Sequence, residues 1–289
     1  MSDPGRPVVL VTGSTDGIGH ATALALARAG ARVVVHGRNR PRLEAAVAAL
    51  TAAAPGAELD SISFDLGSLA AVRAAAGELA RRYPRLDVLI NNAGIFAQER
   101  VLTGDGFEAS LAVNYVAPLV LTELLLPQLA GGTVINVSSI AHLRGQLDLG
   151  DLDLAQGFTG YGAYAQSKLA QVMHALSLAE RHADGELRAF SLHPGVIETK
   201  LLREGFGPVR GGSVASGAAT SVRLAAAVLA GRPGFTAPPD LAPLSLAETP
   251  SGSYLSDGRV AQPSALARDA ALRTGLWATI AARTGLVGG

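Results

Sequence analysis

Residues 8–19 read VVLVTGSTDGIG, and this stretch decides the expected fold. Its first four residues are apolar, as in a buried strand, and its last residues open a helix. The glycines between them allow a tight turn in which the backbone can approach a pyrophosphate, while the following helix N-terminus offers N–H donors. An ordinary glycine-rich turn is the simpler alternative, but the position at the first strand–helix junction favours a dinucleotide site.

The rest of the chain alternates short β-branched runs with longer segments rich in alanine and leucine. Continuous apolar strands that alternate with helices are typical of a parallel sheet covered on both faces. We therefore predict an α/β fold for residues 1–289, a single-domain Rossmann-type doubly wound parallel sheet of about seven strands with helices on both faces. The expected strands are 8–11, 33–35, 59–65, 88–91, 133–138, 187–192 and 253–255, and the expected helices are 18–29, 41–53, 69–82, 107–126, 163–182 and 217–229.

The composition argues against several kinds of site and partner. The 24 Lys and Arg residues balance 24 Asp and Glu residues, so nothing favours nucleic acid or an anionic membrane as a partner. The chain has no cysteine and no HExxH pattern among its six histidines, which predicts no disulfide and no metal site. We see neither a signal sequence nor an apolar stretch long enough to span a bilayer, and expect a cytoplasmic protein.

A YxxxK motif at 164–168 is the strongest catalytic signal. Residues four apart share a helix face, so the phenol of Tyr164 and the ammonium of Lys168 should point the same way. A unit charge about 4 Å away at an effective dielectric of about 20 is worth roughly 4 kcal/mol, or about three pKa units. That shift would bring the phenol near neutrality, where an acid/base catalyst works best. A surface ion pair is the alternative, but Lys168 and Lys200 are the only lysines beside 22 arginines.

Two further polar residues stand at informative positions. Ser139 closes the fifth expected strand, where ligands bind in such sheets, and its hydroxyl could bond a substrate oxygen or simply cap a turn. Asn114 lies within an expected helix, although asparagine is a poor helix former. It is either a tolerated polar residue or a functional one.

The GxxxGxG spacing of the first loop, Asn91-Asn92-Ala93-Gly94 after the fourth strand, and YxxxK closely resemble the short-chain dehydrogenase/reductase family. The resemblance implies hydride transfer between a nicotinamide cofactor and a substrate, with Ser139 orienting oxygen. It also implies that Asn114 kinks its helix and holds a water linked to Lys168, as part of a proton relay. The family usually pairs the helices around Asn114 and Lys168 across two-fold axes, but long insertions sometimes prevent this pairing, so both a homo-oligomer and a single copy stay open.

The resemblance also implies where the cofactor lies. The Pro-Gly turn after the sixth strand should support the nicotinamide, and the segment around 200–215 should form a substrate lid with a C-terminal extension beyond it. Asp65 should cap the adenine amine, unless it merely caps the next helix. The expected cofactor residues are Gly13, Ser14, Thr15, Gly17, Ile18, Gly19, Arg38, Asp65, Leu66, Asn92, Ala93, Gly94, Tyr164, Lys168, Pro194, Gly195, Ile197 and Thr199.

Features outside the motifs are similar to one branch of the family. Ser139 and Tyr164 are 164 − 139 = 25 residues apart, and the chain carries Ala141-His142 and Gly275-Leu276-Trp277. These features look like the branch of retinol dehydrogenases and WW-domain oxidoreductases. The sequence lacks a membrane anchor, a WW domain and the cysteine used by related protochlorophyllide reductases. Retinoid or chlorophyll chemistry is therefore not carried over.

The end of the second expected strand bears on the choice of cofactor. NAD enzymes of this fold usually place a carboxylate there to bind the ribose 2′-hydroxyl. This chain has Gly37 at that place, followed by Arg38, which could grip a 2′-phosphate with two hydrogen bonds. Asp16 argues the other way, because it stands where some NADP-preferring relatives carry a basic residue. We expect NADP(H), with NAD(H) as the alternative.

These observations predict an oxidoreductase that transfers a hydride between NADP(H) and a ketone, aldehyde or alcohol, with Tyr164 as general acid/base. One alternative is reduction of a polarised C=C bond, in which Tyr164 protonates carbon. A non-catalytic nucleotide-binding regulator is less favoured, because all four catalytic residues are present. A mainly apolar substrate, larger than a simple sugar or hydroxy acid, is expected, since the loops carry large apolar residues and few cations, although the leucines among them could instead pack on the core. These residues are Leu147, Leu149, Phe158, Leu201, Leu202 and Phe206.

Overall fold

The computed structural model describes residues 5–207 and 210–286 and contains the predicted doubly wound sheet. Eight strands lie in the order β3-β2-β1-β4-β5-β6-β7-β8, and all neighbours are parallel except β7 and β8. The eighth strand was not predicted from the sequence, because it is short and exposed and lacks an apolar run. The bounds are β1 (Val8–Val11), β2 (Arg32–His36), β3 (Leu59–Ile62), β4 (Val88–Asn91), β5 (Gly132–Val137), β6 (Leu187–His193), β7 (Tyr254–Ser256) and β8 (Arg259–Ala261).

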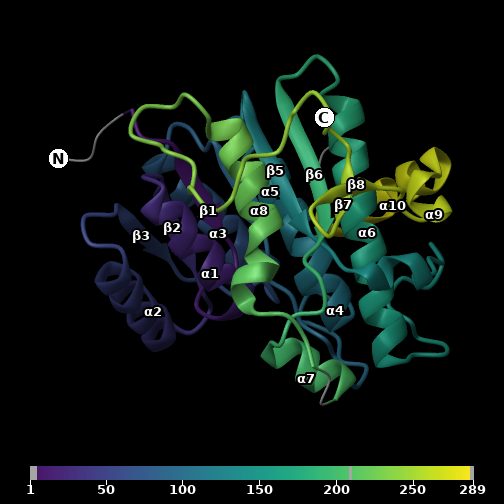
Figure 1. The fold of residues 1–289 in the computed structure, drawn as a ribbon. Helices are drawn as coiled ribbons and strands as arrows, with labels where there is room; N and C mark the ends of the chain where they lie inside the picture. The colour runs from purple at the N-terminus through teal and green to yellow at the C-terminus, as the bar shows by residue number, and fades with distance from the viewer. Residues whose placement is uncertain (1–4, 208–209, 287–289) are drawn as a thin grey trace.

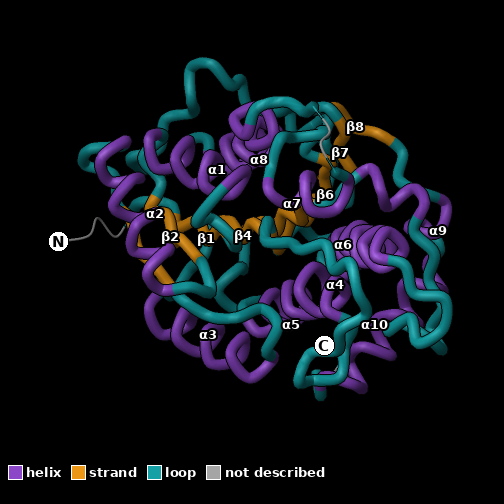
Figure 2. The backbone as a smooth tube through the Cα atoms, turned by 90° about the horizontal axis from the view of Figure 1, so that it is seen from below, coloured by secondary structure: helices purple, strands orange, loops and turns teal. Residues whose placement is uncertain are grey.

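Helices cover both faces of the sheet, which Figure 2 shows edge-on as an orange strip between two purple layers. The helices α1 (Gly17–Arg28), α2 (Arg40–Ala53) and α8 (Val214–Leu229) lie on one face. On the other face lie α3 (Leu69–Arg82), α4 (Ala109–Leu111), the π-helical η1 (Ala112–Val116), α5 (Ala117–Leu124) and α6 (Gly160–Arg181). The single helix expected at 107–126 is thus divided by a π-helical segment, a common feature of functional sites.

Alternating strand residues build a separate apolar core on each face. In β1, Val9 and Val11 pack with the layer of α1 and α8, whereas Leu10 packs with the layer of α3, α5 and α6. Successive side chains of a strand point to opposite faces, so one apolar strand supplies both cores. Among the described residues, no helix combines the length and apolar character needed to cross a membrane.

The strand order brings the functional loops to one edge. The order reverses between β1 and β4, and in such sheets the crevice outside the carboxyl ends of these strands binds ligands. The loops that follow β1, β4, β5 and β6 all open at this edge, and α7 (Lys200–Phe206) lies there as well (Figure 1). The lid expected at 200–215 therefore begins as a helix. Residues 208 and 209 of that segment, and 1–4 and 287–289 of the predicted domain, lie outside the described residues.

The C-terminal extension forms two helices that the sequence did not reveal, α9 (Ala265–Arg268) and α10 (Ala270–Thr284). They pack against α6 (Figure 1). Arg273 of α10 pairs with Glu180 of α6, and the guanidinium of Arg181 lies 4.8 Å from the ring centroid of Trp277. With this cover, residues 114–122 and 163–175 are buried without interruption. A helix that is buried all round has no outer face left for a second copy.

We therefore expect residues 114–122 and 163–175 not to pair with a second copy across a two-fold axis, because these stretches of η1, α5 and α6 have no outer face left. Sedimentation velocity measures the mass. Amide exchange locates any interface: protection of α5 and α6 should not change with concentration. A dimer whose formation adds protection to these two helices would contradict the prediction.

Candidate active site

A cavity of about 730 Å³ opens at the carboxyl ends of β1, β2, β4, β5 and β6. The glycine-rich loop lies at one part of it and the YxxxK residues at another, so a single cavity joins the two motifs. All but two of the predicted site residues line it: Gly13, Thr15, Gly17, Ile18, Gly19, Arg38, Asp65, Leu66, Asn92, Ala93, Gly94, Ser139, Tyr164, Lys168, Pro194, Gly195, Ile197 and Thr199. The exceptions are Ser14 and Asn114.

Two glycines of this loop, Gly13 and Gly19, have no room for a side chain. Gly13 has a φ of +63°, and a Cβ there would lie 2.8 Å from the Cα of Ala93. A Cβ on Gly19 would lie 2.3 Å from the carbonyl oxygen of Gly13. Asp16 begins α1 by accepting a hydrogen bond from the N–H of Gly17 at 2.7 Å. The bare backbone and the helix N-terminus form a cradle that fits a dinucleotide pyrophosphate.

Ser14 lies beneath this loop and does not line the cavity, so its expected place along the cofactor stays a prediction. Its hydroxyl donates to the carbonyl of Val11 at 2.8 Å and accepts from the N–H of His36 at 2.9 Å. His36, which sequence reasoning missed, accepts the N–H of Gly13 through Nδ1 at 3.0 Å, and its Nε2 lies 3.1 Å from the Phe64 carbonyl. Burial lowers its pKa to about 4, so it stays neutral and can accept.

The end of β2 lies at the part of the cavity where the adenosine of a dinucleotide would bind. Gly37 stands there in place of a carboxylate residue. A Cβ on Gly37 would lie 2.4 Å from the methyl group of Thr15, so a larger residue here would displace that side chain. Arg38 is exposed and lines the cavity next to it. Asp65 also lines the cavity, and its Oδ1 accepts the N–H of Gly67 at 2.9 Å. Asp65 therefore caps a turn and still faces the cavity.

The catalytic side chains converge from β5 and α6. Tyr164 and Lys168 lie on one face of α6, and the ammonium is 5.5 Å from the phenol ring centroid. Ser139, directly after β5, caps the following short helix η2 (Ile140–Arg144) and hydrogen-bonds the phenol of Tyr164. Tyr164 is only 5% exposed and Lys168 only 3% exposed. A phenol, a hydroxyl and an ammonium thus meet at one buried corner of the cavity.

Burial shifts the pKa values of Tyr164 and Lys168 in opposite directions. It raises the pKa of Tyr164 to about 12, although the hydrogen bond with Ser139 lowers it. It also lowers the pKa of Lys168 to about 7. The expectation that Lys168 alone brings Tyr164 near neutrality is therefore wrong for these side chains by themselves, because leaving water disfavours phenolate and ammonium alike.

Asn114 lies behind the cavity, inside the π-helical segment η1. Its Oδ1 accepts the N–H of Ile95 at 2.8 Å, and its Nδ2 donates to the Ile95 carbonyl at 3.0 Å and to Ser167 Oγ at 2.9 Å. A Cβ on Gly94 would lie 3.3 Å from Lys168 Nζ and 3.4 Å from Asn114 Oδ1, so the two groups share this glycine as a neighbour. The expected helix irregularity is present, while the water-linked relay stays a prediction.

An apolar wall stands over Tyr164. The ring of Phe96 lies 5.3 Å from that of Tyr164, and Phe96 and Leu201 of α7 both pack against the small apolar cluster that contains Tyr164. The helix α7 approaches Phe96 so closely that a Cβ on Gly205 would lie 2.7 Å from its ring. Leu201 and Leu202 line the cavity as the apolar-substrate prediction required, whereas Leu147 and Leu149 pack on the core instead. The side chain of Phe206 lies outside the described part of the chain.

Phe96 could have been recognised in the sequence by its place two residues after the Asn-Asn-Ala-Gly motif. The loop that follows β4 begins in the cofactor cradle and continues along the cavity through Ile95 and Phe96. Residues that follow a cofactor motif at a strand end are therefore expected to reach the substrate side.

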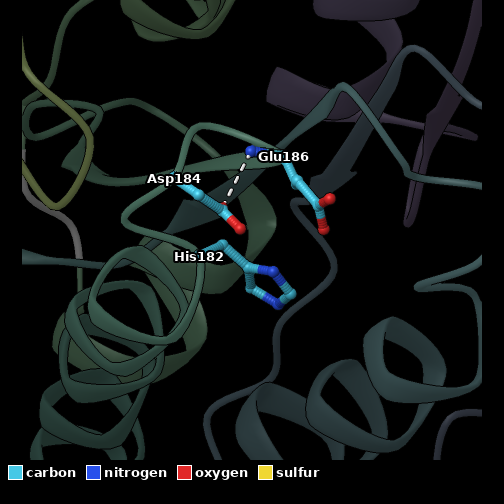
Figure 3. Close-up of side chains that lie close together, drawn as sticks. All are labelled: His182, Asp184 and Glu186. Atoms are coloured by element: carbon cyan, nitrogen blue, oxygen red, sulfur yellow. Dashed lines mark hydrogen bonds between the residues drawn. The ribbon is translucent and has the colours of Figure 1, made fainter.

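Within the described ranges, one group of metal-binding residue types lies close together outside the cavity, namely His182, Asp184 and Glu186 (Figure 3). It stands on the turn between α6 and β6, at the amino end of β6 and hence at the edge of the sheet opposite the cavity. Asp184 and Glu186 are exposed, and Asp184 Oδ1 accepts the N–H of Glu186 at 3.1 Å. These residues belong to a solvated turn and not to the active site.

The short chain dehydrogenase family profile matches residues 7–206 of this sequence. The chain belongs to the short-chain dehydrogenase family. It is an NAD(P)-dependent oxidoreductase in which the family's catalytic motif occupies the buried corner of the cavity.

Relatives of this short-chain dehydrogenase include a Streptomyces sp. (strain C5) protein, provisionally named daunorubicin C-13 ketoreductase DnrU. It is 39% identical over 283 residues, which is 98% of this chain and 93% of the relative. Human retinol dehydrogenase 13 is 37% identical over 204 residues, 69% of this chain and 61% of the relative. A solved Pseudomonas aeruginosa RhlG/NADP active-site complex is 25% identical, with a TM-score of 0.65 over 89% of this chain and 96% of that one.

Tyr164→Phe should lower turnover at least a thousandfold and leave cofactor affinity within about threefold, because only the proton donor is removed. Lys168→Arg should also fail, since a planar guanidinium cannot take the place of a compact ammonium in this buried corner. Steady-state kinetics and cofactor titration measure both effects. Turnover of Tyr164→Phe within tenfold of wild type would contradict the assignment, and near-normal activity of Lys168→Arg would show that Lys168 is not catalytic.

Proposed function

We propose that this short-chain dehydrogenase transfers a hydride between NADP(H) and the carbonyl or hydroxyl carbon of a mainly apolar substrate. The observation that carries the proposal is the meeting of Tyr164, Ser139 and Lys168 at one buried corner of the same cavity that holds the glycine cradle. Such a corner can bind one carbonyl oxygen and give it a proton. The proposal favours a carbonyl or alcohol over a C=C bond, because the polar groups gather around the position of an oxygen.

The chain's own residues hold the oxygen and move the proton. In the reductive direction, Tyr164 donates its phenolic proton to the carbonyl oxygen, and in the oxidative direction its phenolate accepts the proton of the alcohol. Ser139 orients the same oxygen, and the ammonium of Lys168 favours the phenolate. The nicotinamide, when bound, supplies or accepts the hydride and carries a positive charge in its oxidised form. Phe96 and Leu201 exclude water above the phenol.

The lining of the cavity beside Tyr164 supports an apolar substrate. Ile95, Phe96, Val113, Ile140, Leu201 and Leu202 contribute apolar side chains there. Lys200 also lines this region, but it is exposed and pairs with Glu204 at 3.5 Å, so it does not stand ready to clamp a carboxylate. The names of the relatives point the same way, since one concerns a ketone of daunorubicin and another retinol.

We expect apolar ketones, aldehydes or secondary alcohols to be turned over with a kcat/KM at least a hundredfold higher than small charged hydroxy acids, because the wall offers contact area but no anion clamp. A panel of both classes, followed by the absorbance of the reduced nicotinamide, measures this ratio. Phe96→Ala should reduce the preference by raising KM for the apolar class. Efficient turnover of hydroxy acids with none of apolar ketones would contradict the proposed substrate class.

The preference for NADP(H) over NAD(H) is supported by the end of β2. Gly37 stands where NAD enzymes of this fold usually carry the carboxylate that binds the ribose 2′-hydroxyl, so this acceptor is missing. Arg38 stands beside it at the cavity and can bind a 2′-phosphate through two charge-assisted hydrogen bonds. Asp16 also lines the cavity, and its Oδ1 accepts the N–H of Gly17 at the start of α1. The RhlG relative is itself an NADP complex.

Arg38→Ala should weaken NADPH binding about tenfold to a hundredfold and NADH binding less than threefold, because only the 2′-phosphate loses its charged partner. Fluorescence titration of both cofactors measures the two ratios. Arg42→Ala is the matched control, since Arg42 is an exposed arginine on α2 that does not line the cavity. Equal losses for both cofactors, or a wild type that prefers NADH, would overturn the proposal.

A further inference from the structure

The ammonium of Lys168 has two protein acceptors, and one of them is a side chain that the catalytic scheme leaves unexplained. Lys168 Nζ donates to the Val137 carbonyl at 3.0 Å and to Gln171 Oε1 at 2.9 Å. The carbonyl is present whatever residue stands at 137, whereas the second acceptor exists only because residue 171 is glutamine. Three residues apart on α6, Gln171 and Lys168 lie on the same face of the helix.

Packing alone does not explain a glutamine at this position. Gln171 is 1% exposed and lies within residues 163–175, all of which are buried. Its Nε2 is buried and has no hydrogen-bond partner among the described residues. An apolar residue of the same length would fill the space without leaving a buried donor unpaired. The contact of Oε1 with Lys168 is therefore the feature that distinguishes glutamine from such a residue.

Among the described residues, the hydrogen-bond acceptors of the Lys168 ammonium are neutral dipoles. The groups that face it are the phenol of Tyr164 on α6, the Asn114 amide of η1 near Gly94 and the Val137 carbonyl of β5. Burial is the one cause that lowers the pKa of Lys168 to about 7, and no carboxylate of the described chain contributes to this shift. In a buried site each well-directed dipole acts more strongly than it would in water.

We propose that Gln171 is a positioning residue that keeps Lys168 charged and holds its Nζ near Tyr164 and Gly94. What Lys168 then does in the reaction rests on the proposed function, but the effect of the glutamine on the lysine can be measured without a substrate. A neutral amide suits this role because it stabilises the ammonium without cancelling its charge. A carboxylate would also stabilise the ammonium, but it would remove the effect of the lysine on the phenol.

The chain allows a direct test, because Lys168 and Lys200 are its only lysines. Protein labelled with ¹³C in lysine gives two side-chain signals by NMR, and Lys200→Arg assigns them. We expect Gln171→Met, which keeps the length of the side chain but removes the strong acceptor, to lower the pKa of Lys168 by about one unit. Gln171→Glu should raise it, so the three proteins should titrate in the order Met, Gln, Glu.

Gln166→Met is the matched control. Gln166 is also buried on α6, at 2% exposed, and its Nε2 donates to the Leu152 carbonyl at 2.7 Å, with no contact to Lys168. The control loses a buried amide from the same helix and should leave the Lys168 titration unchanged. An unchanged Lys168 pKa in Gln171→Met, or an equal shift in both methionine variants, would overturn the proposal. If Gln171→Met does not fold, Gln171→Glu still tests the proposal through the expected rise in the pKa of Lys168.

Activity provides a second readout that separates this proposal from the proposed function. In alcohol oxidation, the rising limb of kcat against pH should move up by about one unit in Gln171→Met, so that turnover at neutral pH falls about tenfold and approaches wild type at high pH. A uniform loss at every pH would indicate a merely structural role for Gln171. If wild type oxidises no alcohol while the lysine shift is observed, the proposed function fails and the role of Gln171 stands.

Discussion

The close approach of two loops at the reversal of strand order is the constraint on which the site depends. The hydroxyl of Thr12 accepts the N–H groups of Asn92 and Ala93, and the side-chain amide of Asn92 donates to the carbonyls of Thr12 and Gly13. These bonds join the end of β1 to the end of β4. They hold the glycine loop against Ala93, and this contact leaves no space for a Cβ at Gly13. The cofactor cradle is therefore built from two strands and not from the loop alone.

The second requirement is a buried charge next to a buried phenol. In the interior of α6 a phenol resists losing its proton and an ammonium resists keeping one, so the protein alone works against the ion pair that catalysis uses. Hydrogen bonds offset part of this opposition: Ser139 supports the phenolate, and Val137 and Gln171 support the ammonium. The result is a corner whose proton affinities depend strongly on its neighbours, as expected of an acid/base site.

The C-terminal helices contribute to the same corner from outside. The helices α9 and α10 pack against α6, and residues 163–175 of this catalytic helix are buried without interruption. Water is thereby kept from the back of the helix as well as from the cavity side, where Phe96 and Leu201 lie. One of the retinol-dehydrogenase-like features of the sequence, Gly275-Leu276-Trp277, falls in α10 and so forms part of this support.

The sequence by itself determined the elements whose signal is local. The strand residues, the glycine loop and the YxxxK pair could be predicted because apolar runs, φ-permissive residues and helical spacing act over a few neighbouring positions. Tertiary structure alone decided the rest. It showed that Ser14 lies under the loop, that His36 holds that loop from β2, and that α9 and α10 cover α6. It also decided the direction of the pKa shifts, since desolvation depends on what every other element buries and not on the motif itself.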